Sequence, residues 1–544
     1  MTERADSDET VELDGAIADE GTPDQPTAAE AAPDGTAERP VTTREIERKL
    51  RVPALFRRPD VTTAEGIGSV EVHETFTQTA TYYDTDDLRL ARWGVTLRRR
   101  TGGTDDGWHL KLPVPGAPSG DRDEVTLPLD ASPDATVPAA LADIVTALVR
   151  HAPLTAVATL RTERTPLVLR DEHGTEVAEL VDDVVSVLDG DVVAGRFREI
   201  EVESRTGDDR ALGPVVDLLV AAGAEPGVTS KAVHALGPRA TAPPDVPAPG
   251  SPGPRSPARE AVQAHLLLHT RRFLVQDMRV RRGLPDAVHQ MRVAARRLRS
   301  GLRTFRPLLD REWADALRGE LAWAAGELGA VRDTEVLLDR LDRHADLLEE
   351  PLLAERVRAV VDPALRARLE AATAEALEAM RTERHLALLD ALVAAAREPA
   401  FTAAADDDCR DVLPPLAQAA WRRLVRTVEV LELEGESTEW HAARIAAKRA
   451  RYALESLEPV FGRPAERFAE ALEEVTEQLG EHQDAHVARL TLRELADTPG
   501  HDGLEGFALG MLHGLEDAAE MAARRRFVRL WPRVRRVHRK TRLR

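Results

Sequence analysis

In several segments between residues 41 and 238, charged residues occupy every second position. The charged positions are Glu45, Glu47 and Lys49; Arg98 and Arg100; His109 and Lys111; and Glu199, Glu201 and Glu203. Successive side chains of a strand point to opposite faces, so each segment predicts a strand with one charged stripe. Small barrels usually fill their interior with apolar side chains. Here we expect a sheet that closes around a charged interior, with helices covering its apolar outer face.

The same pattern divides the chain into parts. Short alternating runs and Gly-containing turns across residues 41–238 predict an antiparallel sheet with few helices. Residues 239–257 form a Pro-rich linker, and residues 258–544 show a helical period of 3.6. Residues 1–40 are acidic and poor in large apolar residues, which predicts a disordered tail. The predicted fold class is α+β: a β tunnel or barrel followed by an all-α domain.

The helical part contains an internal repeat. Residues 289–299 match residues 441–451, and residues 328–333 match residues 479–484, at offsets of 152 and 151 residues. Two nearly equal offsets in the same order indicate two copies of one helical unit. Each copy has room for about four helices, which predicts two four-helix bundles.

Composition narrows the possible functions. The net charge of −21 disfavours general binding to nucleic acids, although the charge is unevenly distributed. The single Cys409 excludes an intramolecular disulfide framework and most cysteine metal sites, as expected in a reducing cytosol. No apolar run approaches the ~20 residues of a membrane span, and no signal pattern opens the chain. We expect a cytoplasmic protein without a membrane partner.

The charged stripes predict a site for a metal-bound polyphosphate. One such strand is usually a solvated face, but four of them would leave the sheet without a core on that side. Carboxylates are the ligands that hard divalent cations prefer, and Mg²⁺ also shares oxygens of a bound phosphate. Arg and Lys neutralise phosphate oxygens. When the sheet closes, Glu45 and Glu47 could meet Glu201 and Glu203.

The motifs of this part resemble those of the CYTH domain, the family of triphosphate tunnel metalloenzymes. They are Glu45-x-Glu47-x-Lys49, Tyr82-Tyr83-Asp84-Thr85, Leu97-Arg98-Arg99-Arg100, Trp108-His109-Leu110-Lys111, Glu201-Val202-Glu203 and Ser230-Lys231. The family includes inorganic triphosphatases, thiamine triphosphatases and class IV adenylate cyclases. The resemblance implies an eight-stranded antiparallel tunnel that binds a triphosphate with Mg²⁺ or Mn²⁺.

The resemblance also implies roles for individual residues. The implied metal ligands are Glu45, Glu47, Glu201 and Glu203, with Asp183 as a further one. The implied phosphate clamp is Arg98, Arg100, Lys111, Arg164 and Lys231, and Lys49 is similar to a lysine that helps to position the attacking water. Two assignments stay open: whether Asp182 or Asp183, and whether Arg161 or Arg164, faces inward. His109 lies two positions before Lys111, so both side chains would point to the same face of a strand. His109 could therefore line the tunnel, and a purely structural role stays open as well.

The helical part carries basic stripes in both repeats. His289, Arg292, Arg296 and Arg299 share one helical face, which Arg303 and Arg306 continue; His441, Arg444, Lys448 and Arg451 repeat its opening. A solvated face is the usual explanation for one such helix. Its repetition in an acidic protein favours a polyanion site.

These helices resemble the CHAD domain, a histidine-containing helical family associated with polyphosphate binding and often fused to CYTH. The similar segments are residues 289–299, 328–333, 441–452 and 479–486. The first repeat has Val331 and Glu335 where the second has His482 and His486, so histidine chemistry shared by both repeats is doubtful. The basic residues from Arg524 to Arg544 could extend the polyanion surface, contact RNA or cap the last helix, and their place after the CHAD-like module favours the first.

Together these patterns predict a metal-dependent hydrolase of inorganic triphosphate or short polyphosphate with a helical domain that binds longer chains. Two alternatives stay open: a non-catalytic polyphosphate-binding protein, and a triphosphatase acting on thiamine triphosphate or ATP. The intact acidic set favours catalysis, and the lack of an obvious aromatic cluster favours the inorganic substrate. The oligomeric state and an association with polyphosphate granules are undecided.

Overall fold

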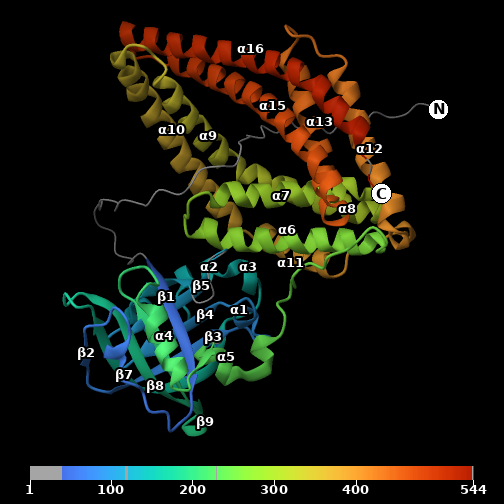
Figure 1. Cartoon of the computed structure of the whole chain (residues 1–544). Coiled ribbons are helices and arrows are strands. Elements are labelled where there is room, and N and C mark those ends of the chain that lie inside the picture. Colours follow the sequence, from blue (N-terminus) through green and yellow to red (C-terminus); the bar gives the residue numbers. More distant parts are fainter. Residues whose placement is uncertain (1–39, 115, 117–120, 228–229, 542, 544) are drawn as a thin grey trace. The chain divides into compact units, whose positions relative to one another are not determined.

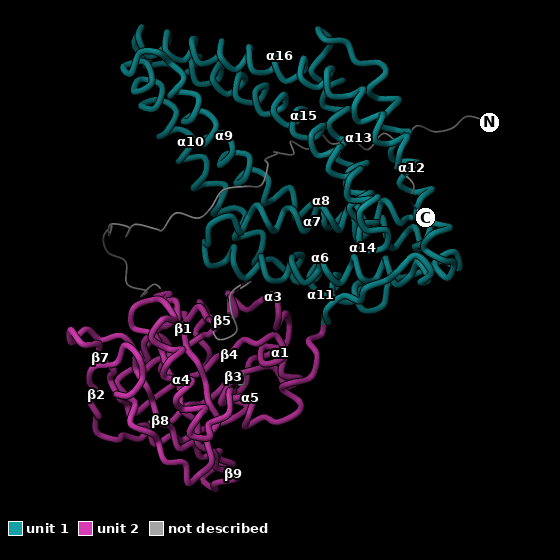
Figure 2. Tube along the Cα trace, viewed as in Figure 1, with its two compact units in different colours: residues 1–27, 246–544 teal, residues 28–245 magenta. Residues whose placement is uncertain are grey.

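The computed structural model describes residues 40–114, 116, 121–227, 230–541 and 543. The predicted disordered tail therefore lies outside the described residues, apart from Pro40. The chain divides into two compact units between Asp245 and Val246, within the Pro-rich segment 239–257 (Figure 2). Each unit is described by itself below.

The first unit is built on a closed antiparallel barrel (Figure 1). Its strands are β1 (Val41–Val52), β3 (Phe76–Asp84), β4 (Thr96–Thr101), β5 (Gly107–Pro113), β6 (Asp121–Leu127), β7 (Thr155–Arg170), β8 (Glu176–Asp189) and β9 (Val192–Ser204). They pair in the order β1-β6-β5-β4-β3-β7-β8-β9, and β9 returns to β1, so eight strands close the ring. The short strands β2 (Ser69–Val72) and β10 (Glu225–Gly227) pair with β7 and β1. The predicted barrel is confirmed.

The apolar alternate positions of the strands form a core on the outer side of the barrel. Leu50, Leu180 and Ile200 are buried there with Val202. Helix α4 (Leu212–Ala221) packs its Leu212, Val215 and Leu219 into the same cluster. Because the apolar positions are used outside, the charged positions of the same strands are left to line the interior.

Short helices lie next to several strands of the barrel in the chain order. The buried Asp84 ends β3 and accepts hydrogen bonds from the backbone N–H groups of Leu90 and Ala91 in α1 (Arg89–Arg92), both at 2.9 Å. Helices α2 (Ala139–Ile144) and α3 (Thr146–Val149) follow β6. Ser230 caps α5 (Lys231–Leu236), whose Ala232 packs against Tyr82 and other inward apolar side chains of the barrel. Lys231 therefore enters the barrel from a helix, not from a strand.

The second unit is helical, as predicted (Figure 1). Its helices are α6 (Ala258–Arg281), α7 (Ala287–Thr304), α8 (Arg311–Glu327), α9 (Gly329–Ala345), α10 (Pro351–Met380), α11 (Glu383–Arg397), α12 (Cys409–Val428), α13 (Ser437–Glu455), α14 (Glu458–Phe461), α15 (Arg463–Ala496) and α16 (Gly503–Lys540). The repeat offset relates α6 to α12, α7 to α13, and α10 to α16. The pair α8 and α9, interrupted at Leu328, corresponds to the single long α15.

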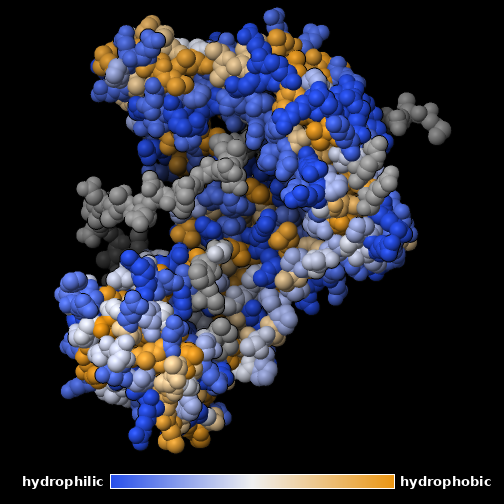
Figure 3. All heavy atoms as spheres, viewed as in Figure 1, coloured by the Kyte–Doolittle hydropathy of each residue, from blue (hydrophilic) through white to orange (hydrophobic). Residues whose placement is uncertain are grey.

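The helices pack in two groups of four with a shared extension. In the first group, α6 and α8 each contact α7 and α11. In the second group, α13 contacts α12 and α15, and α15 contacts α16. Helices α9 and α10 pack on the distal parts of α15 and α16 around a common apolar core that includes Leu341, Leu365 and Leu492. No helix within the described residues is both long enough and apolar enough to cross a bilayer. On the face shown in Figure 3, hydrophilic side chains cover much of this unit.

Candidate functional site

Strand register brings the predicted acidic and basic residues to the inner face of the barrel. Lys49 is paired with Glu201 between β1 and β9, and Arg164 with Asp183 between β7 and β8. Asp183 is in turn paired with Glu199 of β9. Directly opposed residues of antiparallel strands share a face of the sheet. These side chains therefore line one charged interior.

Three buried carboxylates form the tightest acidic group. Asp183, Glu199 and Glu201 each offer an oxygen within 4.8 Å of the others. Lys231 Nζ lies among them, 3.0 Å from Asp183, 2.6 Å from Glu199 and 2.9 Å from Glu201. Burial opposes the charge of Lys231, but the three carboxylates outweigh it and raise the lysine pKa. By its donor chemistry this group could bind a hard divalent cation.

A second acidic group comes from β1 and β9. Glu45 lies 2.5 Å from Lys111 Nζ, and Glu47 lies 2.9 Å from Lys49 Nζ. Glu203 is paired with Glu47 across the two strands. Burial, reinforced by the charges of Glu45 and Glu47, raises the pKa of Glu203 to about 7. The five predicted metal ligands thus all lie inside the barrel, in two groups.

The five predicted clamp residues also face the interior. Arg164 donates to both oxygens of Asp183, at 2.9 and 2.6 Å, and lies 3.2 Å from Glu201. Arg98 lies 3.6 Å from Glu124, and Arg100 pairs with Asp105. Lys111 and Lys231 have the contacts given above. Each cation is held against a carboxylate, which fixes its position before any ligand arrives.

The structure decides the assignments that the sequence left open. Asp182 points outward and binds Arg198, at 2.6 Å, whereas Asp183 points inward. Arg161 is exposed, and Arg164 is the inward arginine of β7. The inner face also holds His109, whose Nδ1 lies 3.0 Å from Glu124 and whose Nε2 lies 2.9 Å from the carbonyl oxygen of Asp105.

Three inner acidic residues were missing from the predicted site. Glu199 lies two positions before Glu201 on one strand, so the period of two that marked Glu201 and Glu203 could have found it. Glu124 is paired with Lys111 by register, and burial of its carboxyl is outweighed by His109, Lys111 and Arg98, which lower its pKa. Asp105 lies in a loop, where periodicity gives no signal.

A cavity opens beside these residues. Its volume is about 420 Å³, and its lining includes Glu47, Lys49, Lys111, Arg122 and Ser230. The volume is in the range of small-molecule sites. The charge of the lining suits a small anion.

The predicted basic residues of the helical unit differ in burial. Arg292, Arg444 and Lys448 are buried, and the half-buried ones are His289, Arg296, Arg299, His441 and Arg451. Arg292 lies 3.5 Å from Asp333. All three guanidinium nitrogens of Arg444 are buried and lack a hydrogen-bond acceptor among the residues that the structure describes. The positive charge of Arg444 acts on the carboxyl of Asp484, where it opposes the rise in pKa that burial causes.

The basic stripes of the two repeats approach each other. Helix α7 contacts α13, and the guanidinium groups of Arg296 and Arg297 lie 5.4 and 4.8 Å from the ring centre of Tyr452. Near them Arg303 is surrounded by further arginines from α7, α8, α12 and α13: Arg299, Arg318, Arg423 and Arg449. Arg303 is exposed, but burial of part of its side chain and then repulsion by these neighbours lower its pKa to about 9. Such a concentration of like charge favours a polyanion.

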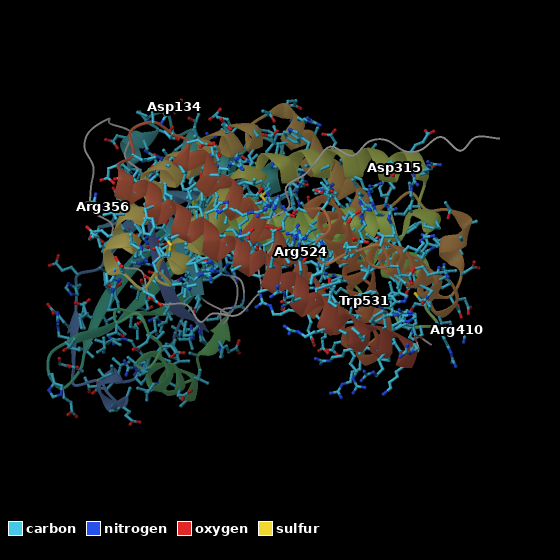
Figure 4. The ribbon with its side chains drawn as sticks, turned by 90° about the horizontal axis from the view of Figure 1, so that it is seen from above. Asp134, Asp315, Arg356, Arg410, Arg524 and Trp531 are labelled. Carbon is cyan, nitrogen blue, oxygen red and sulfur yellow. The ribbon has the colours of Figure 1, made fainter. Side chains whose placement is uncertain are left out.

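The histidines of the second repeat face a carboxylate. His482 lies 3.3 Å and His486 lies 3.4 Å from Glu520 of α16, which also binds Arg524 at 3.0 Å. Arg524 and Trp531 follow each other along α16 in Figure 4. The first repeat has Val331 and Glu335 at the corresponding positions. This arrangement is therefore specific to the second repeat.

Two family models match the chain: CYTH over residues 43–226 and CHAD over residues 264–493. The chain belongs to the family of proteins that join a CYTH domain to a CHAD domain. The uncharacterized proteins MT2285 and Rv2226 of Mycobacterium tuberculosis are each 34% identical to it over 508 residues, or 89% of this chain and 95% of theirs.

Solved structures similar to parts of the chain include PptA from Streptomyces chartreusis, with 29% identity over 51% of this chain and 100% of that chain and a TM-score of 0.45. The CHAD domain from the plant Ricinus communis has 27% identity over 51% of this chain and 93% of its own, with a TM-score of 0.42. The putative adenylyl cyclase HpAC1 from Hippeastrum is described with a dominant triphosphatase activity. It has 21% identity over 36% of this chain and 98% of its own, with a TM-score of 0.23.

The CYTH domain is thus the barrel, and the CHAD domain is the helical unit. CYTH domains are a metal-dependent family of triphosphatase and adenylyl cyclase type. The buried trio of Asp183, Glu199 and Glu201 fits that dependence, because its oxygens are close enough to share one cation.

Proposed function

We propose that the CYTH domain hydrolyses inorganic triphosphate or short polyphosphate with Mg²⁺ or Mn²⁺, and that the CHAD domain binds polyphosphate. The observation that carries the proposal is the interior of the barrel. It joins the buried carboxylates Asp183, Glu199 and Glu201 to the cations Arg98, Arg100, Lys111 and Arg164. A metal triphosphate needs both ligand types within one enclosed space.

The donor set supports a metal. Glu45 Oε2 is buried without a hydrogen-bond donor in the described part of the chain. Burial raises the pKa of Glu203, and the charges of Glu45 and Glu47 add to that rise. Both features are consistent with an excess of negative charge around Glu45, Glu47 and Glu203, which the neighbouring lysines do not fully neutralise. The residues that would hold the metal are Glu45, Glu47 and Glu203 in one group and Asp183, Glu199 and Glu201 in the other. A bound Mg²⁺ would polarise phosphate oxygens and stabilise charge during transfer.

The other residues of the interior supply binding and orientation. Arg98, Arg100 and Arg164 offer planar donors to phosphate oxygens, and their carboxylate partners hold them in place. Lys49 lies between Glu47 and Glu201, at 2.9 and 2.5 Å. From this position its ammonium group would orient a water molecule toward the terminal phosphorus atom. Groups held ready where charge develops account for a large share of enzymatic rate enhancement.

The CHAD domain offers one support for polyphosphate binding: the exposed Arg303 lies among four further arginines. A bound polyanion would relieve the repulsion among these side chains. The proposal for this domain depends on charge, so binding should fall as salt rises.

A phosphate-release assay tests the proposed hydrolysis. Triphosphate, long polyphosphate, thiamine triphosphate and ATP are offered with Mg²⁺ or Mn²⁺, and triphosphate should react fastest. Asp183→Asn should abolish release, whereas Asp182→Asn, on the outer face next to it, should retain it. Thermal unfolding of both variants checks that each is folded. Failure of the wild type to release phosphate from any substrate would overturn the proposed hydrolysis.

A further inference from the structure

The loop between β4 and β5, residues 102–106, folds back against strand β3. Gly102 has a φ of 88°, and a Cβ there would lie 2.9 Å from the carbonyl oxygen of Thr77. A Cβ on Gly103 would lie 3.0 Å from Gln78 Oε1 and 3.2 Å from Asp105 Oδ1. The two glycines therefore permit an approach that other residues would block.

This approach delivers a carboxylate to the phosphate clamp. Asp105 pairs with Arg100, whose side chain is only 5% exposed. Burial opposes ionisation of Asp105, but the charges of Arg100, Arg98, His109 and Arg164 outweigh it and lower its pKa. Three of the five clamp cations thus act on one loop carboxylate. Chemically, this carboxylate stands where an anionic oxygen of a ligand would be expected.

The loop is held in this position by its own contacts. Asp106 Oδ1 accepts a hydrogen bond from the Gly103 N–H at 2.7 Å, and His109 Nε2 lies 2.9 Å from the carbonyl oxygen of Asp105. The cavity lining includes Lys49 and Lys111, but among the described residues it does not extend to Arg98, Arg100 or Arg164. This cavity therefore stops short of the arginines that Asp105 engages.

We infer that Asp105 limits the length of the phosphate chain that the barrel accepts, because its fixed carboxylate takes the position of a further phosphate at the arginine end. This inference rests on the proposed phosphohydrolase function. A triphosphate would extend from the lysines and the metal ligands to Arg98 and Arg164, whereas one more phosphate would meet the negative charge of Asp105 beside Arg100. Like charges brought together at a binding site weaken binding strongly.

The full-length chain provides the test with Asp105→Asn, which keeps the side-chain shape and removes its charge. The Asp105 side chain is 44% exposed, and asparagine keeps an oxygen that can accept from the buried Arg100. Because the counter-charge of Arg100 is lost, melting curves check that the variant is folded. Asp106→Asn is the matched control: it makes the same charge change one residue away, and its side chain bonds the loop backbone. Initial rates and calorimetric binding are measured with inorganic triphosphate and linear tetraphosphate, with Mg²⁺.

Asp105→Asn should raise the tetraphosphate-to-triphosphate ratio of kcat/KM and of affinity by roughly tenfold. Asp106→Asn should leave both ratios at the wild-type value. The CHAD domain is identical in all three proteins, so its binding cancels in the comparison. An unchanged ratio in Asp105→Asn, with active wild type, would overturn the inference and leave the hydrolase intact. A shifted binding ratio without hydrolysis would support the length limit and overturn the hydrolase. Absence of binding to either anion would overturn both.

Discussion

Glu203 stands directly opposite Glu47 where β9 pairs with β1, and both carboxylates face the interior of the barrel. Burial, with the charges of Glu45 and Glu47, raises the pKa of Glu203 from 4.5 to about 7. The folded protein therefore binds a proton that the unfolded chain releases near pH 4.5. In the absence of metal, the contribution of Glu203 to the free energy of unfolding falls as pH rises from about 4.5 through about 7.

Glu203→Gln should remove this pH dependence. In EDTA, the melting temperature of the variant should exceed that of the wild type at pH 8, and the difference should shrink toward pH 5. Mg²⁺ should reduce the difference at pH 8, because a bound cation favours the ionised wild-type carboxylate. Glu163→Gln, an exposed residue of β7, is the control. A difference that stays constant from pH 5 to pH 8 would contradict the raised pKa.

Lys231→Met should make the stability of the protein depend on metal. The substitution leaves Asp183, Glu199 and Glu201 buried without their shared cation. Removing one partner of a buried ion pair costs about 3–5 kcal/mol. In EDTA the variant should melt well below the wild type, and Mg²⁺ should stabilise the variant more than the wild type. Melting curves across a Mg²⁺ titration measure this.

Arg198→Ala provides the comparison for Lys231→Met, since its ion pair with Asp182 lies on the outer face. Its melting temperature should respond to Mg²⁺ as the wild type does. Equal Mg²⁺ responses in Lys231→Met and the wild type would argue that Asp183, Glu199 and Glu201 do not hold a cation.

The sequence was sufficient to predict the barrel because the charged residues repeat with the period of a strand. It could not choose between Asp182 and Asp183, since a shift of one residue moves every side chain to the other face. Partners from other strands make that choice: Arg198 of β9 holds Asp182 outside, and Arg164 of β7 holds Asp183 inside. Register between distant strands is a property of the closed sheet.

The helical part shows a different limit. Helical spacing correctly places Arg292 and Arg444 on the basic faces of α7 and α13, but spacing does not reveal what covers a face. Both residues are buried, because α8 and α9 pack near Arg292 and α15 packs on α13. The neighbours Arg303 and Arg423 lie on α7 and α12, far apart in the sequence, and only tertiary packing brings them together.

Arg98→Ala should lower kcat for triphosphate by about 10²–10³, as loss of a prepositioned charge stabiliser commonly does. The Arg98 side chain is 11% exposed and lies 3.6 Å from Glu124 on the inner face. Arg99→Ala, on the opposite face of the same strand, should change kcat far less. Steady-state kinetics of both variants, with circular dichroism to compare folding, make the comparison. Equal losses would contradict the proposed clamp.

Polyphosphate binding by the CHAD domain should depend on exposed arginines of the cluster around Arg303. Arg303→Glu with Arg423→Glu should weaken binding of long polyphosphate at least tenfold, because both side chains are exposed and repel each other in the free protein. Charge reversal at the buried Arg292 would instead test folding. The full chain should carry Glu201→Gln so that the ligand is not hydrolysed during the measurement.

Arg366→Glu on α10 is the control for this double variant, because its side chain is 66% exposed and lies outside the cluster. Affinity is measured across a salt series. The wild type should lose affinity steeply as salt rises, because cations displaced from the polyanion are released on binding. The double variant should show a shallower dependence, since it makes fewer phosphate contacts. If Arg366→Glu weakens binding as much as the double variant does, the effect reflects net charge alone, and the arginine cluster is not the binding site.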